Sequence, residues 1–194
     1  MFSALVLSTV VIFVAELGDK SQLMAMTFAT RYRARDVILA ITAATLIVHL
    51  ASVAIGFWIG EAFAGYQSWI AIGAGIAFLI FGAWTLRGDE LTEEEASKAR
   101  KATGTALLAV GTAFFLAELG DKTMLATITL ATREGWFGTW IGSTLGMVLA
   151  DALAIAVGAL LGRNLPEKAI KIGAAILFFA FGAILIAEGL GWVG

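Results

Sequence analysis

Residues 16–21 read Glu-Leu-Gly-Asp-Lys-Ser, and residues 118–123 read Glu-Leu-Gly-Asp-Lys-Thr. The copies are 102 residues apart, and ten of sixteen positions are identical between 16–31 and 118–133. Both copies lie inside long apolar segments, where each charged side chain costs roughly 2.5–3.5 kcal/mol on membrane-insertion scales. A costly motif that occurs twice at one spacing predicts a duplicated unit that works inside a membrane.

The composition supports this reading and excludes several classes of protein. Of the 194 residues, 60% are hydrophobic and only 14% are charged, against about 25% charged residues in soluble domains. Cysteine is absent and there is one histidine, which excludes thiol chemistry, disulfides and zinc sites built on several histidines. The net charge of −2 gives no indication of a nucleic-acid partner. We therefore expect an all-α integral membrane protein, with a lipid bilayer as its surroundings.

The apolar sequence is long enough for six spans of roughly 20 residues each. As one helix the first span would be about 43 Å long, which exceeds a hydrocarbon core of about 30 Å. The fourth span is similarly long, and each contains one motif, so we expect breaks at Gly18 and Gly120. The spans are expected at about 2–30, 36–60, 69–86, 105–132, 137–161 and 164–190.

The loop charges predict an orientation. The turns after the first, third and fifth spans hold ten Lys or Arg residues, whereas the opposite loops hold only Arg133. The ten-residue side should be cytoplasmic, with both termini outside. Three spans per unit is an odd number, so the second unit should be inverted relative to the first. We expect repeats at 1–87 and 104–194, joined by a cytoplasmic linker at 88–103. The linker should contain a short helix, in which Thr92 and Glu95 form a capping box and Glu94 pairs with Lys98.

The motif residues predict a cation site at the midplane. If 16–19 is helical, Glu16 and Asp19 share a face and Lys20 can reach Glu16. An inverted repeat would bring the two motifs together, and their side chains offer only oxygen ligands, which suit hard cations such as Ca²⁺, Mg²⁺ or Mn²⁺. The predicted ligands are Glu16, Asp19, Glu118 and Asp121, and the supporting residues are Lys20, Ser21, Lys122 and Thr123.

The charge balance predicts exchange of a divalent cation for protons. Four carboxylates and two lysines leave −2, which one divalent cation neutralises. Without metal, desolvation and like-charge repulsion favour protonated carboxyl groups. Metal and protons would then compete for one site that opens alternately to the two sides. Another interpretation is that each Glu pairs with the Lys of its own motif and only stabilises packing.

Two further polar residues align in the repeat. His49 and Asp151 lie 102 residues apart, each in the middle of a predicted span. A proton relay or a gating role fits the cost of a carboxylate in mid-span. A polar residue that is hydrogen-bonded between helices is the other reading of His49.

The paired motifs resemble those of the Gdt-type family of small cation exchangers, which has Golgi, chloroplast and bacterial members. The resemblance covers essentially the whole chain. It implies export of Mn²⁺ and/or Ca²⁺ from the cytosol in exchange for protons, with the eight motif residues named above as the site. The cation is then a transported substrate, no cofactor is expected, and the chain is not an enzyme. The chain lacks the long N-terminal extension of organelle members, so we expect a multi-pass protein of a prokaryotic inner membrane.

Three alternatives remain at this point. The carboxylates would also bind the ammonium group of a basic amino acid, or form the acidic ring of a passive divalent cation channel. An intramembrane metalloenzyme would need a further catalytic group, for which only His49 is available. The sequence leaves open whether the chain forms a homo-oligomer.

Overall fold

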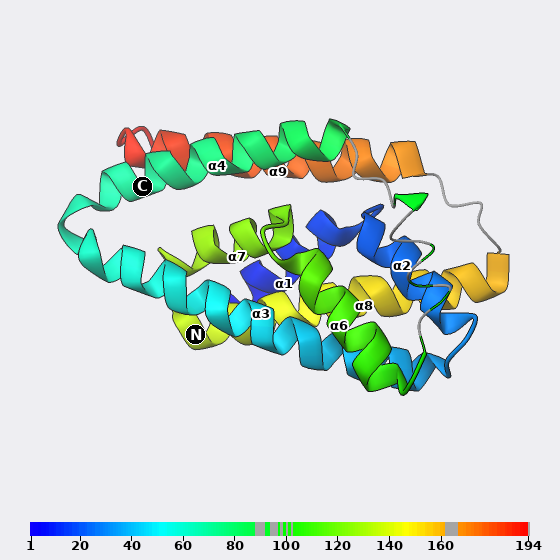
Figure 1. The fold of residues 1–194 in the computed structure, drawn as a ribbon. Coiled ribbons are helices and arrows are strands. Elements are labelled where there is room, and N and C mark those ends of the chain that lie inside the picture. Colours follow the sequence, from blue (N-terminus) through cyan, green and yellow to red (C-terminus); the bar gives the residue numbers. More distant parts are fainter. Residues whose placement is uncertain are drawn as a thin grey trace.

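The computed structural model describes residues 1–87, 92, 93, 97, 99, 101, 103–161 and 167–193, and within them it contains helices and no strand. Figure 1 shows the arrangement of these helices. A single 3₁₀ turn, Ala64–Tyr66, separates the third and fourth helices. The helices are α1 (Phe2–Glu16), α2 (Lys20–Ala29), α3 (Ala34–Ala62), α4 (Gln67–Arg87), α6 (Ala106–Glu118), α7 (Lys122–Ala131), α8 (Trp136–Leu161) and α9 (Glu167–Gly189).

Four of the described helices, α3, α4, α8 and α9, are each long and apolar enough to cross a bilayer. The pair α1 and α2 also qualifies when joined, although it is bent by 78° at its break. Helix α6 is apolar but shorter, at 13 residues. The chain is therefore an all-helical membrane protein, with four or five candidate spans among its described residues.

Both motif segments interrupt their helices, as the sequence predicts. Gly18 has φ +77° and Gly120 has φ +78°, a left-handed conformation that costs other residues roughly 1–2 kcal/mol. Helix α1 ends at Glu16, and Asp19 is the extended residue that precedes α2. Because the helix stops between Glu16 and Asp19, the condition under which they would share one helical face is not met.

Close packing of α1 on α8 and of α7 on α3 depends on glycine. A Cβ atom at Gly142 would lie 2.4 Å from the carbonyl oxygen of Leu5, and at Gly56 2.3 Å from that of Ile128. A Cβ atom would likewise lie 2.6, 2.6 and 2.5 Å from a backbone oxygen at Gly138, Gly146 and Gly60, respectively. Gly56 and Gly60 form a Gly-x-x-x-Gly pattern, which lets α3 approach α7 closely. At the positions 102 residues later, Gly158 faces the side chain of Met26, and Gly162 lies outside the described residues.

Helices α4 and α9 form a separate pair that lies beside the remaining helices (Figure 1). Gly75 and Gly182 allow the two backbones to meet, with Cβ-to-oxygen distances of 2.6 and 2.7 Å. Four phenylalanines fill the centre of the pair, with ring centroids 4.8–6.4 Å apart. They are Phe78 and Phe81 of α4 and Phe178 and Phe181 of α9.

Equivalent positions of the two sequence halves meet at two places. The Thr45 hydroxyl donates to the Met147 sulfur at 3.1 Å, and these residues are 102 apart. In the last helix of each half the sequences align at an offset of 100, as Phe81-Gly82-Ala83 and Phe181-Gly182-Ala183 show, and the rings of Phe78 and Phe178 lie 5.9 Å from each other. Helices of one half also pack against helices of the other half, since α1 lies along α8 and α6 lies along α3.

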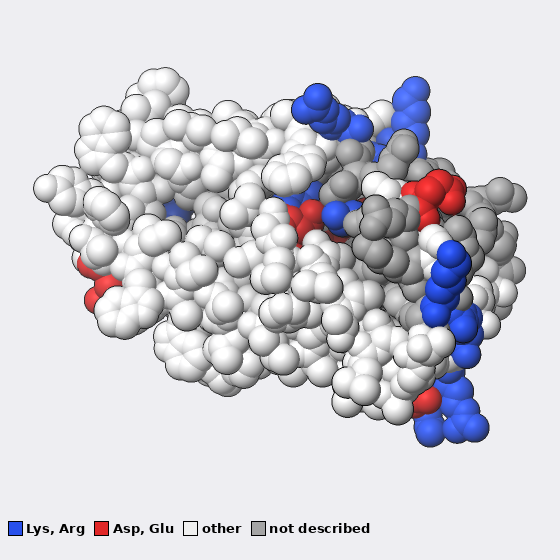
Figure 2. Space-filling view, in the orientation of Figure 1, with Lys and Arg blue, Asp and Glu red and all other residues white. Residues whose placement is uncertain are grey.

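Lys and Arg gather at one end of the molecule in the face seen in Figure 2. This end holds the turn between α2 and α3 (Figure 1). The predicted capping box and the Glu94–Lys98 pair of the linker lie outside the described residues, apart from Thr92. So does the predicted start of the last span at 164–166.

Candidate functional site

Three carboxylates from both motifs come together where the two breaks meet. Glu16, Asp19 and Asp121 each offer an oxygen, and these oxygens lie within 4.8 Å of one another. The three side chains are buried, and the most exposed of them, Asp121, is 5% exposed. Like charges held this close in a buried region need a cation or protons to balance them. This group is what the sequence predicts for three of the four ligands.

Hydroxyl groups from both halves hold Glu16. Ser21 donates to Oε2 at 2.5 Å, and Thr123 of the second motif donates to Oε1. Each carboxylate oxygen has two lone pairs, so Glu16 can accept both bonds and still bind a cation. The orientation of the Glu16 side chain therefore depends on both halves of the sequence.

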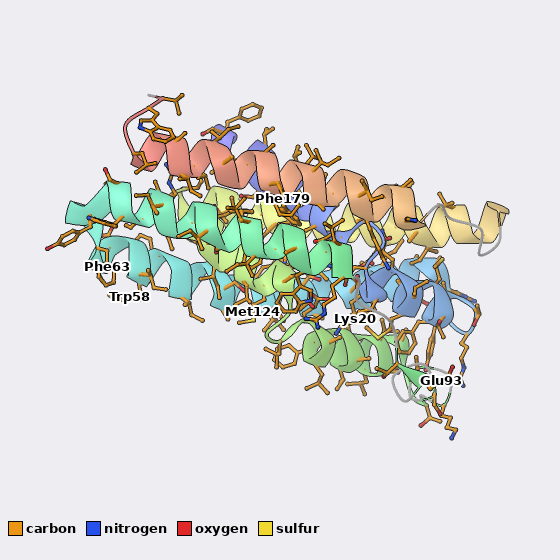
Figure 3. The ribbon with its side chains drawn as sticks, turned by 90° about the horizontal axis from the view of Figure 1, so that it is seen from above. Lys20, Trp58, Phe63, Glu93, Met124 and Phe179 are labelled. Atoms are coloured by element: carbon orange, nitrogen blue, oxygen red, sulfur yellow. The ribbon has the colours of Figure 1, made fainter. Side chains whose placement is uncertain are left out.

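The lysines interact across the two halves. Lys122 Nζ donates to Asp19 Oδ1, and both side chains are buried. Asp19 Oδ2 has no hydrogen-bond partner among the described residues. Lys20, labelled in Figure 3, interacts electrostatically with Asp121. The alternative of a purely local Glu–Lys pair within each motif does not describe Lys122, whose ion pair joins the two motifs.

The fourth predicted ligand, Glu118, lies close to the group without being part of it. Its side chain is 1% exposed, and it is repelled electrostatically by Glu16, Asp19 and Asp121. Its Oε2 atom has no hydrogen-bond partner among the described residues. Glu118 is therefore in range of the charges of the site, with one oxygen available.

Asp151 and His49 are both fully buried in the middle of α8 and α3. Asp151 interacts electrostatically with Glu16 and Asp19, which places it beside the first motif. Within the described part of the chain, neither Asp151 oxygen and neither His49 ring nitrogen has a hydrogen-bond partner. The reading of His49 as a residue hydrogen-bonded between helices therefore finds no support here.

Gln22 is a site residue that sequence reasoning missed. Its Oε1 accepts from Gly18 N at 2.8 Å, and its Nε2 donates to the Ala150 carbonyl of α8 at 2.9 Å. It thus ties the first break to the helix that carries Asp151. The equivalent position is Met124, whose sulfur accepts from Gly120 N at 3.2 Å (Figure 3). The signal was present in the sequence, because a polar residue stands inside an apolar segment four positions after Gly18.

Comparisons with known proteins identify the family. The chain matches the family model described as "Divalent cation/proton antiporter GDT1" over residues 4–93 and 106–192. It is 34% identical over 138 residues to the "Putative manganese exporter" of Vibrio cholerae, covering 69% of this chain and 64% of that protein. It is 31% identical over 197 residues to the rice "GDT1-like protein 2, chloroplastic", covering 88% of this chain and 57% of that protein.

A GDT1-like protein of Synechocystis is 28% identical over 202 residues, covering 95% of this chain and 97% of that protein. The chain thus spans less than two thirds of the Vibrio and rice relatives and nearly all of the Synechocystis one. No solved structure matches the chain. The match to the family model covers most of the chain and both motifs, and the chain belongs to the GDT1 family of divalent cation/proton antiporters.

Proposed function

We propose that this chain exports Mn²⁺ and/or Ca²⁺ from the cytosol in exchange for protons, at the site formed by the two motifs. The observation that supports this most directly is the group of Glu16, Asp19 and Asp121, which joins carboxylates from both halves. Together with Glu118, Ser21 and Thr123 it offers only oxygen ligands, which hard divalent cations prefer. Transport assays on this chain test whether it exports Mn²⁺, Ca²⁺ or both from the cytosol.

The proposed architecture is six spans arranged as two inverted repeats, 1–87 and 104–194. The joined helices α1–α2 and α6–α7 are the broken spans of the two repeats. Two findings support this arrangement: the matching breaks at Gly18 and Gly120, and the contact of Thr45 with its equivalent Met147. Inverted repeats with broken helices at the midplane are a common plan for alternating access. The excess of Lys and Arg at one end supports a cytoplasmic linker, with both termini outside a plasma membrane.

The charges around the site support exchange with protons. Asp151 adds a fifth carboxylate to the four of the motifs, and with Lys20 and Lys122 the formal charge becomes −3. Without a cation the region needs three protons to be neutral, and with one divalent cation it needs one. Binding of the cation would therefore release two protons. His49 and Asp151, which are buried with open hydrogen-bonding capacity, are the proposed proton-handling residues.

The test is transport by the purified protein in liposomes that contain a pH-sensitive dye. Mn²⁺, Ca²⁺ and Mg²⁺ are added outside separately, and proton efflux is followed. The site variant is Glu16→Gln/Asp121→Asn, and the matched control is Glu61→Gln, an exposed carboxylate outside the site. We expect cation-dependent proton efflux in the parent and in Glu61→Gln but not in the site variant.

Other outcomes would support the alternatives. Cation entry without proton movement indicates a passive channel. The ion pair of Lys122 with Asp19 shows that an ammonium group fits beside these carboxylates, so lysine or arginine is included as a substrate. Transport at the parent rate by the site variant would refute the proposed site.

A further inference from the structure

The molecule divides into two bodies that contact each other sparsely. One body is the pair α4 and α9, and the other is the bundle of α1–α3 and α6–α8. Within each body, backbone meets backbone at glycines: Gly75 and Gly182 in the pair, and Gly56 and Gly142 in the bundle. Among the described residues, α4 contacts the bundle chiefly through α7. The interface between the bodies is therefore the weaker contact and the one that can separate.

A cavity of about 280 Å³ lies in this interface. Its walls are mostly apolar and come from both bodies, namely Leu7 and Leu130 of the bundle and Ala74, Phe78 and Phe181 of the pair. Its charged residues are Arg133, Glu134 and Glu188, which lie where α7 and α9 end. This is the end of the molecule opposite to the gathered Lys and Arg residues, which is the outer end in the proposed orientation.

One ion pair joins the two bodies at the mouth of the cavity. Arg133, just after α7, donates to Glu188 of α9 at 2.6 Å. Arg133 is 21% exposed and Glu188 is 45% exposed, so the pair is partly hydrated and of modest strength. Arg133 is also the only Lys or Arg in the predicted outer loops. Paired with Glu188, it holds α7 and α9 together at this mouth.

The two breaks at Gly18 and Gly120 differ in their contacts with helices α4 and α9. A Cβ atom at Gly18 would lie 3.4 Å from the Lys171 side chain of α9, whereas one at Gly120 would meet nothing within 4 Å. Helix α9 thus covers the break at Gly18, whereas the break at Gly120 is left uncovered. Two equivalent breaks with unequal cover fit a chain held in one of two states, with the outer end closed by α7, α9 and their ion pair.

We propose that the Arg133–Glu188 ion pair is the outer gate of the transport path, and that it separates when the cavity opens to release the cation. This inference rests on the proposed function for its orientation and its cargo. The pair adds no ligand to the cation site. It sets how often the outer end opens, and so Arg133 and Glu188 are gating residues and not binding residues.

The gate is tested by thiol accessibility, which requires no transport. The chain contains no cysteine, so Ala74→Cys introduces a single thiol on the wall of the cavity. A membrane-impermeant thiol reagent is applied to the outside of spheroplasts, and the labelling rate of Ala74→Cys is measured. We expect Arg133→Ala in this background to raise the rate about two- to fivefold, the range that a partly exposed ion pair supplies.

Two matched variants control for general loosening. Arg87→Ala removes an arginine at the other end of α4 and should leave the labelling rate unchanged. The charge swap Arg133→Glu/Glu188→Arg should return the rate to that of Ala74→Cys alone. An unchanged rate in Arg133→Ala, or an equal rise in Arg87→Ala, would overturn the proposed gate.

A cross-link gives the second measurement. Arg133→Cys/Glu188→Cys is joined by a bifunctional thiosulfonate reagent, which bridges the space left when two long side chains are replaced by cysteine. Cation transport should be lost on cross-linking and restored by reductant, whereas the same reagent should not abolish transport by either single-cysteine variant. Transport by the cross-linked protein refutes the gate. If the parent moves no divalent cation, the proposed function fails, and the labelling rates still decide the gate.

Discussion

Replacing Lys122 by methionine tests whether this lysine balances the charge of the cation site. The substitution keeps a long side chain but removes the ammonium that pairs with Asp19, and both residues are at most 4% exposed. Removing one partner of a buried ion pair typically destabilises by about 3–5 kcal/mol. For a chain of this length each kcal/mol shifts Tm by roughly 2–4 °C, so Lys122→Met should lower Tm by about 6–20 °C without metal.

A bound divalent cation should recover much of this loss. Mn²⁺ at a hundred times its Kd stabilises the folded state by about 2.7 kcal/mol. In the variant, Mn²⁺ supplies the positive charge that Asp19 has lost. In the parent, Mn²⁺ must compete with the Lys122 ammonium for the same carboxylate. The rise in Tm on adding Mn²⁺ should therefore be larger in Lys122→Met than in the parent.

The assay is thermal unfolding in detergent, followed by tryptophan fluorescence with chelator or with Mn²⁺. Lys168→Met, which changes an exposed lysine near the start of α9, is the matched control and should match the parent in both conditions. An equal deficit for Lys122→Met with and without Mn²⁺ would show that the lysine acts in packing alone. No deficit in either condition would refute the stabilising role of the ion pair.

Three further substitutions test the packing, the break and the ligand orientation. Gly142→Ile should abolish folded protein on size-exclusion chromatography, because its Cβ would lie 2.4 Å from a backbone oxygen of α1, whereas Gly73→Ile, with nothing within 4 Å, should stay folded. Gly120→Ala places a side chain at φ +78° and should lower Tm by about 2–8 °C; an unchanged Tm would mean that the break tolerates another conformation. Thr123→Val removes a donor to Glu16 and should raise the Kd for Mn²⁺ about tenfold or more in a binding titration; an unchanged Kd would remove this hydroxyl from the site.

The breaks were predictable because two independent signals agree. The first span is too long for a bilayer as one helix, and Gly18 stands beside a charged residue within it. The same reasoning placed Gly120. The consequence for the side chains was not predictable in the same way. Helical spacing put Glu16 and Asp19 on one face, but the chain leaves the helix directly after Glu16, so their proximity comes from the turn.

The partners within the site depend on how the two halves pack. Spacing along the sequence allows each Lys to pair with the Glu of its own motif, whereas Lys122 in fact pairs with Asp19 of the other motif. The position of Asp151 next to the first motif likewise follows from the packing of α8 on α1 and α2. Gln22 was overlooked because an uncharged amide gives a weak signal, although its two hydrogen bonds fix the first break to α8.

The exchange of packing partners between the halves has a consequence for biosynthesis. Helix α1 is made first, yet it packs along α8, which is made much later. Until then, the side of α1 that carries Ser8 and Glu16, both fully buried in the finished protein, has no helix to cover it. The nascent first half must therefore wait in the membrane or its insertion machinery with polar groups exposed. A gene split in the linker should yield folded protein only when both fragments are made in the same cell.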